Sequence, residues 1–94
     1  MGRNYIKAIG DGFLRDQVDL DGKVLELVEY PGEGLLVLCI YNRYVANDVK
    51  CYRIYRDMGL WLIVCPGNLL VVSDVFELGD ARSVYDQVFK LCRR

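Results

Sequence analysis

The amino-acid sequence predicts an α+β fold: a mainly antiparallel meander sheet of about five or six strands, with one C-terminal amphipathic helix packed on one face. Three observations predict it. Short apolar segments recur between turn signals at intervals of about ten residues, as in an antiparallel meander. The segment 13–20 alternates between apolar and polar residues, and the segment 80–94 changes to helical periodicity. The 94 residues have room for one core, so we expect a single small α+β domain over 1–94.

Two predicted strands precede the first hairpin turn. The stretch 4–9 (NYIKAI) fits a first strand, and Gly10-Asp11-Gly12 ends it. The stretch 13–20 (FLRDQVDL) alternates, which places three apolar residues on one side: Leu14, Val18 and Leu20. Asp21-Gly22 then supplies the Asp-Gly pair of a tight hairpin turn, because both central residues of that turn need a positive φ.

The more apolar strands follow. The stretch 23–30 (KVLELVEY) is rich in β-forming residues, and the sequence PGEG ends it. The stretch 35–41 (LLVLCIY) is continuously apolar, which predicts a central strand that is covered on both faces or lies at a subunit contact. After a turn at Met58-Gly59, continuously apolar segments recur at 60–65 (LWLIVC) and at 69–76 (LLVVSDVF). We expect the arm Leu60 to Val64 of the first segment to lie in the core.

The stretch 41–57 (YNRYVANDVKCYRIYRD) fits two structures, so its part 43–56 is open between a hairpin and a helix. A hairpin would turn at Ala46-Asn47-Asp48, since Asn and Asp favour turns while Tyr, Val and Ile favour strands. A helix would contain several residues of low helix propensity. We therefore predict the hairpin. The choice decides whether Tyr52 and Tyr55 share a face, because on a strand they do not and on a helix they do.

The segment 80–94 (DARSVYDQVFKLCRR) predicts the helix. Apolar residues recur there at spacings of three and four, which places one set on a single helical face: Ala81, Val84, Tyr85, Val88, Leu91 and Cys92. Asp80 is the expected N-cap, and the cations near the end complement the helix dipole. If this stripe covers one face of the sheet, the other face carries tyrosine, arginine and some exposed aliphatic side chains. A sheet face of this kind often binds a partner or a second copy.

Composition predicts a folded, cytoplasmic protein. Hydrophobic residues make up 53% and charged residues 27%, as in ordinary globular domains that fold without metals or disulfides. The longest apolar run, 35–41, is too short for a membrane helix, and the N-terminus lacks the apolar centre of a signal peptide. Three of the four cysteines lie in apolar runs and no Cys-x-x-Cys occurs, so we expect small buried hydrophobes rather than metal ligands.

The sequence holds no catalytic or cofactor motif, so we expect neither enzyme activity nor a bound cofactor or metal. It contains no histidine, which removes the commonest general base and every histidine-activated nucleophile. Asp19 and Asp21 have the spacing of calcium-loop ligands, but Gln17 and Val28 stand at the first and last ligand positions of such a loop.

Two groups of residues are candidates for protein binding. One group gathers tyrosine and arginine, the residue types enriched at interface hot spots: Tyr44, Tyr52, Arg53, Tyr55 and Arg56. The other belongs to the acidic stretch 10–34: Asp16, Asp19 and Asp21. We predict a small non-catalytic protein-interaction domain, of the kind by which phages and mobile elements inhibit a host complex (anti-CRISPR or antirestriction type). The part of this stretch from Asp16 to Glu33 would then face a basic nucleic-acid channel of that host nucleic-acid-processing complex.

Two alternatives stay open at this point. A single-stranded nucleic-acid-binding domain would stack bases on Tyr52 and Tyr55 beside Arg53 and Arg56. The sequence pI near 5.3 makes nucleic acid the less expected partner. The other alternative is a small-molecule-binding domain with its pocket between sheet and helix. We also expect a homodimer, since three apolar strands in so short a chain favour burial beyond one monomer.

Overall fold

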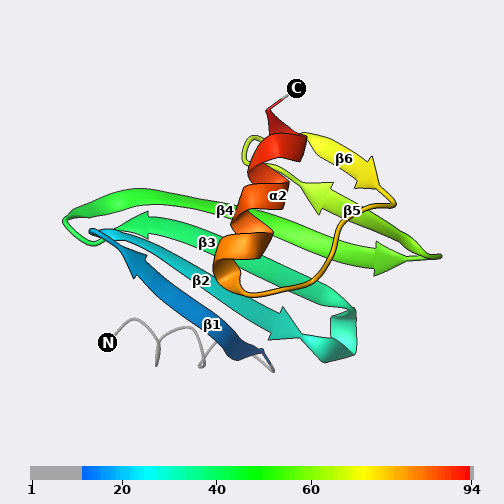
Figure 1. Cartoon of the computed structure of the whole chain (residues 1–94), viewed down its shortest axis with the longest axis horizontal. Coiled ribbons are helices and arrows are strands. Elements are labelled where there is room, and N and C mark those ends of the chain that lie inside the picture. The colour runs from blue at the N-terminus through cyan, green and yellow to red at the C-terminus, as the bar shows by residue number, and fades with distance from the viewer. Residues whose placement is uncertain (1–11, 94) are drawn as a thin grey trace.

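The computed structural model describes residues 12–93, which form a six-stranded antiparallel sheet and one C-terminal helix (Figure 1). Every strand pairs with its neighbours along the chain, so the sheet is a meander, as predicted. The strands and helices in chain order are β1 (Phe13–Leu20), β2 (Lys23–Tyr30), the short 3-10 helix η1 (Pro31–Glu33), β3 (Leu35–Asn42), β4 (Val45–Asp57), β5 (Leu60–Val64), β6 (Leu70–Ser73) and α2 (Ala81–Cys92). The strand predicted at 4–9 lies outside the described residues.

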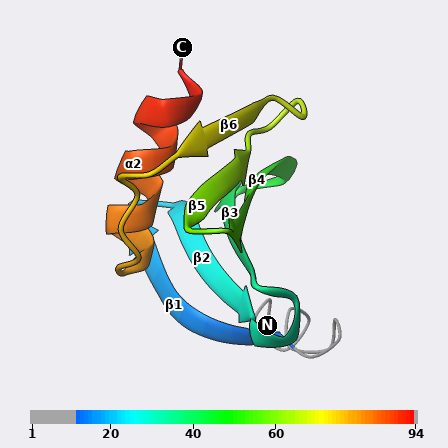
Figure 2. The same cartoon turned by 90° about the vertical axis from the view of Figure 1, so that its right-hand side faces the viewer.

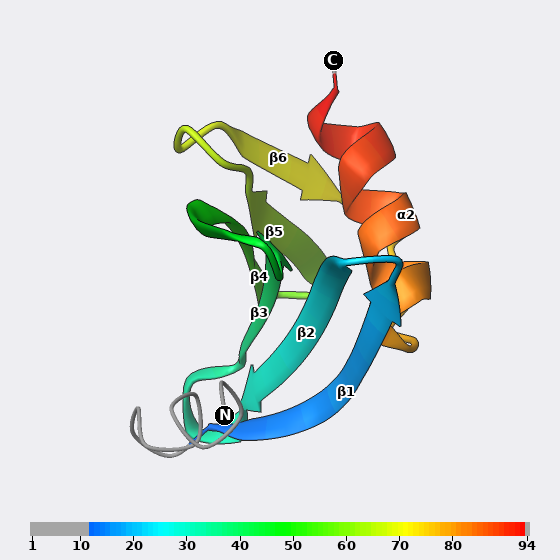
Figure 3. The ribbon, with the colours of Figure 1, turned by 90° about the vertical axis from the view of Figure 1, so that its left-hand side faces the viewer.

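The sheet curves toward α2, which lies on its concave side (Figures 2 and 3). The helix packs against β1, β2 and β3. Its contact residues are Ala81, Val84 and Val88, which are fully buried, and they belong to one core with side chains from β2 to β5. This core is the one that the helical stripe of the sequence predicts. Burial of an apolar stripe on an apolar sheet face is the main force that holds such a two-layer domain together.

The predicted turns at Asp21-Gly22 and Met58-Gly59 are confirmed. All four residues have positive φ values, which is the geometry of the tight hairpin turn. At the first turn, the Asp19 Oδ1 atom also accepts a hydrogen bond of 2.8 Å from the Gly22 N–H group. The turn residues therefore fix the β1–β2 register locally, before any packing against the helix.

Substitution of Gly22 by alanine should lower the free energy of unfolding by about 1–2 kcal/mol, because φ is +92° there and L-residues disfavour that region. An added Cβ would also lie 2.8 Å from a ring carbon of Tyr44, which would have to swing away. Gly32 is the matched control, since an added Cβ there meets nothing within 4 Å and its φ is not left-handed. Urea titration of both variants checks the prediction, and equal stability of the two would contradict it.

The stretch 43–56 is extended, as predicted, but the predicted turn position is wrong. The chain turns at Arg43 and Tyr44, and Ala46-Asn47-Asp48 lie inside β4. Two hydrogen bonds fix the turn: the Tyr44 N–H donates to Asn42 Oδ1, and the Arg43 N–H donates to the Gly22 carbonyl, both at 2.8 Å. Residues 46–48 instead interrupt the pairing, since they stand between the paired positions Val45 and Val49.

The predicted alternation of 13–20 holds only for part of β1. The register shifts between Leu14 and Asp16, so Leu14 pairs with Val28 while Val18 pairs with Leu25. Val28 and Leu25 belong to opposite faces of β2. Leu14 therefore lies on the face away from α2, and the prediction that it shares a side with Val18 and Leu20 is wrong. A β-bulge of this kind changes which face the following residues occupy, and the sequence pattern alone does not reveal it.

Helix α2 begins where the sequence predicts. Asp80 is the N-cap, and its Oδ1 atom accepts a hydrogen bond of 2.8 Å from the Ser83 N–H group. A second carboxylate reaches the same end from the sheet, because Asp16 Oδ2 accepts from the Ala81 N–H group at 2.7 Å. Asp16 thus ties β1 to the first turn of the helix. Within residues 12–93, no helix is long and apolar enough to span a membrane.

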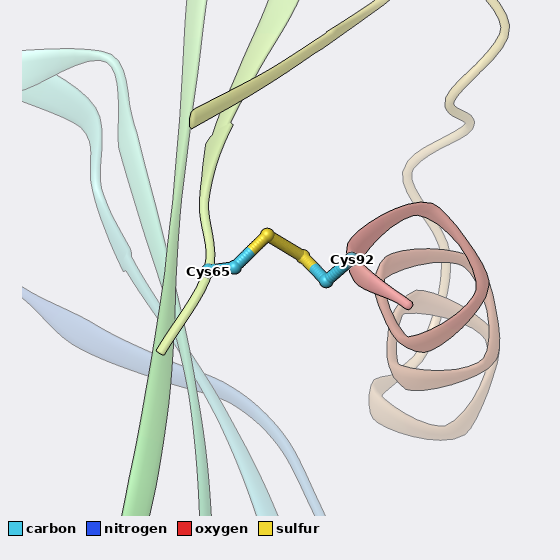
Figure 4. The surroundings of a disulfide bond; sticks show 2 residues. All are labelled: Cys65 and Cys92. Carbon is cyan, nitrogen blue, oxygen red and sulfur yellow. A yellow bond between two sulfur atoms is a disulfide. The ribbon is translucent and has the colours of Figure 1, made fainter. Parts of the chain in front are cut away.

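Cys65 and Cys92 form a disulfide bond, which corrects the expectation that the cysteines act only as small buried hydrophobes (Figure 4). Cys65 follows β5 directly and is buried, while Cys92 is the last residue of α2. The bond joins the C-terminal end of the helix to the part of the sheet beyond β1, β2 and β3. Cys92 was correctly placed on the helical face that meets the sheet, but the spacing of 27 residues identifies no partner for it.

Candidate protein-binding face

The pairing register assigns each strand residue to one of two sheet faces, because directly paired residues lie on the same face. Leu38 pairs with Tyr52, and Ile54 pairs with Ile63. All four are buried in the core with the helix residues, so they mark the covered face. The residues that alternate with them belong to the opposite face, which we call the open face, although on β2 its residues Val24, Glu26 and Val28 are buried.

On the open face, the register joins two rows of side chains across the last three strands. Arg53 pairs with Val64 and Val64 with Leu70, while Tyr55 pairs with Leu62 and Leu62 with Val72. We call these residues the open-face array: Arg53, Tyr55, Leu62, Val64, Leu70 and Val72. All are apolar or aromatic except Arg53.

Among the aromatic and aliphatic residues of the open-face array, exposure rises toward the end of the sheet. Tyr55, Leu62 and Val64 are half-buried, whereas Leu70 is 57% and Val72 is 53% exposed. β6 is also the last strand of the sheet within the described residues. The sheet therefore ends in an edge strand whose open face is aliphatic, a combination that soluble monomers usually avoid.

Arg53 is the charged group of the open-face array. It is exposed and stands between Val37 on β3 and Val64 on β5. Its Nη2 atom donates a long hydrogen bond of 3.5 Å to Asn68 Oδ1. A guanidinium has five N–H donors, and this long bond uses one of them. The exposed Arg53 side chain therefore keeps donors for a partner, and its paired neighbours in the sheet are aliphatic.

The structure divides the predicted tyrosine and arginine group between both faces and one turn. Only Arg53 and Tyr55 lie together on the open face. Tyr52 is 6% exposed and belongs to the core, and the Arg56 guanidinium lies 4.6 Å from the centre of the Trp61 ring. Tyr44 is 80% exposed but occupies the turn at the other end of β4. Residues 52 and 55 therefore point to opposite sides, as the strand alternative requires.

The acidic candidates have structural contacts of their own. Asp16 bonds the first helical N–H group, as described above. Asp19 accepts the turn hydrogen bond with one oxygen and forms a salt bridge to Arg43 with the other. Asp21 is a positive-φ residue of the first turn. Asp19 and Asp21 thus lie at the β1–β2 turn, away from the open-face array, while Asp16 faces the helix.

Four residues of the open-face array were not predicted, and two of them, Leu62 and Val64, belong to the arm Leu60 to Val64 that was expected in the core. That assignment is correct only for Ile63, which is 0% exposed, and for Trp61, which packs against the core. Leu60 is 39% exposed. The available signal was strand alternation: a strand with one covered face cannot bury every residue of a continuous apolar run.

A polar cluster lies on the open face beside the array, across β1 to β4. Gln17 pairs with Glu26, Glu26 with Cys39, and Cys39 with Cys51. The Glu26 carboxylate is buried and accepts hydrogen bonds from Gln17 Nε2 and, at 3.0 Å, from the Tyr41 hydroxyl. Burial, followed by the hydrogen bond to Glu26, raises the pKa of Tyr41. Both hydrogen bonds reach Oε2, whereas Oε1 is buried without a hydrogen-bond partner among the described residues.

A small depression of about 160 Å³ lies on the covered side, between α2 and the ends of β2, β3 and β4. Its lining includes Lys23, Lys50, Tyr52, Tyr85 and Phe89. The Lys23 ammonium lies 5.5 Å from the centre of the Tyr85 ring, so part of its charge is already satisfied by a cation–π contact. This volume is smaller than the few hundred Å³ of an ordinary ligand pocket.

Among residues 12–93, no group of three or more acidic or cysteine side chains is arranged to hold a metal ion. The chain matches no protein-family model, and no curated protein or solved structure matches it significantly.

Proposed function

We propose that the protein is a protein-interaction domain that binds its partner through the open-face array. The observation that carries this proposal is the exposure of Leu70 and Val72, at 57% and 53%, on the edge strand of the sheet and beside the apolar residues Leu62 and Val64. Burial of such side chains against a partner is favourable by about 25 cal/mol for each Å² of apolar surface removed from water. The position of the array beside an unpaired strand edge adds backbone groups that a partner strand can bond.

The composition of the array sets the chemistry of the partner. Leu62, Val64, Leu70 and Val72 suit an apolar surface. Arg53 adds one cation near the centre, so a partner carboxylate opposite it would form a charge-assisted hydrogen bond. Tyr55 supplies a large, rigid ring with a polar tip, a residue type that is common at interface hot spots. The partner surface is therefore apolar with an acidic group.

Two lysine substitutions on the edge strand, Leu70→Lys together with Val72→Lys, should abolish partner capture without unfolding the protein. Both side chains are exposed, so the substitutions place charge on the surface rather than in the core. Val75→Lys with Leu78→Lys is the matched control, because those residues are 74% and 41% exposed and lie outside the array. Cross-linking and affinity capture from the native host, read by mass spectrometry, compare the three proteins.

A protein that the wild type and the control capture, and that the edge-strand variant does not, supports the proposal. Equal capture by all three proteins would contradict it. Sedimentation of the same variants covers the case of a homodimer, in which the second copy is the partner. Identity of the partner as a host nucleic-acid-processing complex, and a role as a phage or mobile-element inhibitor, remain predictions from size and composition.

A nucleic-acid role has weaker support. The four residues of that prediction lie on two faces: Arg53 and Tyr55 on the open face, Tyr52 and Arg56 on the covered one. A stacking platform needs its aromatic rings on one surface, and Tyr52 is buried. Absence of salt-dependent binding to a labelled single-stranded oligonucleotide would remove this alternative.

A further inference from the structure

Cys39 and Cys51 form a second cysteine pair, and both are free thiols. They are directly opposite each other on β3 and β4, and their Sγ atoms are 2.7 Å apart. Cys51 is exposed and Cys39 is half-buried. The sulfur atoms are thus already closer than two unbonded sulfurs normally lie, and little movement separates them from a covalent bond.

We propose that Cys39 and Cys51 form a thiol–disulfide exchange site that reduces small disulfides of the glutathione class and stores the oxidising equivalents as a cross-strand disulfide. Cys51 is the attacking sulfur, since it is the exposed one. Cys39 is the resolving sulfur, since it lies within reach of Cys51 and is less exposed.

The exchange balances in two steps. The Cys51 thiolate attacks one sulfur of the small disulfide, which breaks that S–S bond, forms a mixed disulfide on Cys51 and releases the first small thiolate. Cys39 then loses its proton to that thiolate or to water and attacks Cys51 Sγ, which forms the Cys39–Cys51 bond and releases the second small thiolate. The two protein thiols are oxidised, and one small disulfide is reduced to two thiols.

The surroundings of the pair give the two sulfurs different roles. The hydrogen bond from the Cys39 thiol lowers the pKa of Cys51 to about 7. The same bond, together with burial and the negative charges of Cys51 and Glu26, raises the pKa of Cys39. Near pH 7 Cys51 is therefore the sulfur that ionises, in about half of the molecules, while Cys39 keeps its proton. Once Cys51 is in a mixed disulfide, it carries no charge and no longer opposes ionisation of Cys39.

The Cys65–Cys92 bond differs from this pair in its access to solvent. Cys65 is 4% exposed and Cys92 is half-buried, so that bond is less accessible to a small thiol than the exposed Cys51 is. Cys51 lies on the open surface of β4. Exposed disulfides exchange readily, whereas buried ones resist reduction. A range of glutathione potentials should therefore exist in which the Cys39–Cys51 pair exchanges while Cys65–Cys92 stays oxidised.

Tryptic peptide mapping can follow the two bonds separately, because lysine and arginine residues place each cysteine on its own peptide. The peptides are 24–43 with Cys39, 51–53 with Cys51, 57–82 with Cys65 and 91–93 with Cys92. The full-length protein is equilibrated in reduced and oxidised glutathione over a series of ratios, quenched in acid, alkylated and digested. We expect the link between peptides 24–43 and 51–53 to form when oxidised glutathione dominates and to break when reduced glutathione dominates. The link between peptides 57–82 and 91–93 should persist over the same ratios.

Two single variants test the assigned roles. Cys39→Ser, which keeps a hydroxyl donor beside Cys51, should accumulate a glutathione adduct on 51–53. Cys51→Ser should form a glutathione adduct on 24–43 at pH 7, at a rate on the order of tenfold lower than the rate at which Cys39→Ser forms its adduct on 51–53. In Cys39→Ser, alkylation of Cys51 should reach half its maximal rate below the pH at which an ordinary thiol does.

Three results would overturn the proposal. The first is full alkylation of Cys39 and Cys51 at every glutathione ratio. The second is a Cys39–Cys51 bond that survives conditions in which Cys65–Cys92 is reduced. The third is faster adduct formation on Cys39 than on Cys51. None of these results depends on capture of a partner, so failure of this proposal and failure of the proposed function are separate outcomes.

Discussion

Replacement of Cys92 by serine is expected to lower the free energy of unfolding by about 3–4 kcal/mol. The bond to Cys65 spans 27 residues, and the chain-entropy relation gives about 3–4 kcal/mol for a loop of that size. Loss of the bond changes the free energy of the folded state less than that of the unfolded state, because α2 still packs its apolar stripe on β1, β2 and β3. The principal effect is therefore in the unfolded chain, which regains the freedom that the covalent loop removes.

Urea titration under oxidising and reducing conditions measures this effect. Cys39→Ser and Cys51→Ser should be present in every protein compared, so that the other cysteine pair does not respond to the reductant. Dithiothreitol should then lower the urea concentration at which the protein with Cys65 and Cys92 is half unfolded. The lowered value should equal that of the Cys92→Ser protein. The Cys92→Ser protein itself should not respond. An unchanged midpoint after complete reduction would contradict the expected contribution of the bond.

Substitution of Leu38 by alanine is expected to cost about 3 kcal/mol, within the range of 2–5 kcal/mol found for buried leucines. Leu38 is 0% exposed in an interior strand and lies opposite Leu27 on one side and Tyr52 on the other. Alanine would leave a cavity beneath the helix, since neither neighbouring strand can move inward without breaking its ladder. The loss combines the transfer free energy of the removed carbons with the cavity.

Leu70→Ala is the matched control for Leu38→Ala. The chemical change is the same, but Leu70 is 57% exposed on the open face, and such surface changes usually stay within about 0.5 kcal/mol. Circular dichroism during urea unfolding compares the two variants with the wild type at one pH. A comparable loss in both would mean that the open face is packed in solution, as in a tight homodimer, and a small loss in both would contradict the assigned core.

Much of the fold could be predicted from the sequence because local chemistry determines it. Asp21-Gly22 and Met58-Gly59 have the residue types that tolerate positive φ, and the helical spacing of 80–94 matches a real stripe. The meander needs only pairings between neighbours along the chain, which short turns impose. The turn before β4 was misplaced because Asn47 and Asp48 are equally suited to interrupt a strand, and the bonds that fix the true turn come partly from Gly22, far away in sequence.

The candidate site could be predicted only in kind. An open face carrying tyrosine, arginine and aliphatic residues was expected, and Arg53 and Tyr55 lie there. A continuously apolar strand does not show which of its residues face solvent, so Leu62 and Val64 were assigned to the core, and Leu70 and Val72 were not identified as binding residues. Both cysteine pairs depend on register and on how the helix end meets β5. Two residues that are 12 or 27 positions apart can pair without producing any periodic pattern in the sequence, so the sequence does not predict such pairs.

The Cys65–Cys92 bond has a consequence for how copies of this chain can associate. It closes a covalent ring that contains β6, the connection 74–80 and α2. Small domains often dimerise by domain swapping, in which identical terminal elements change places between copies. An oxidised, folded copy cannot release its helix in this way, since the ring holds both ends of the exchanging segment. Exchange of the helix alone is thereby blocked in oxidised copies, whereas the reduced chain is free to exchange its helix.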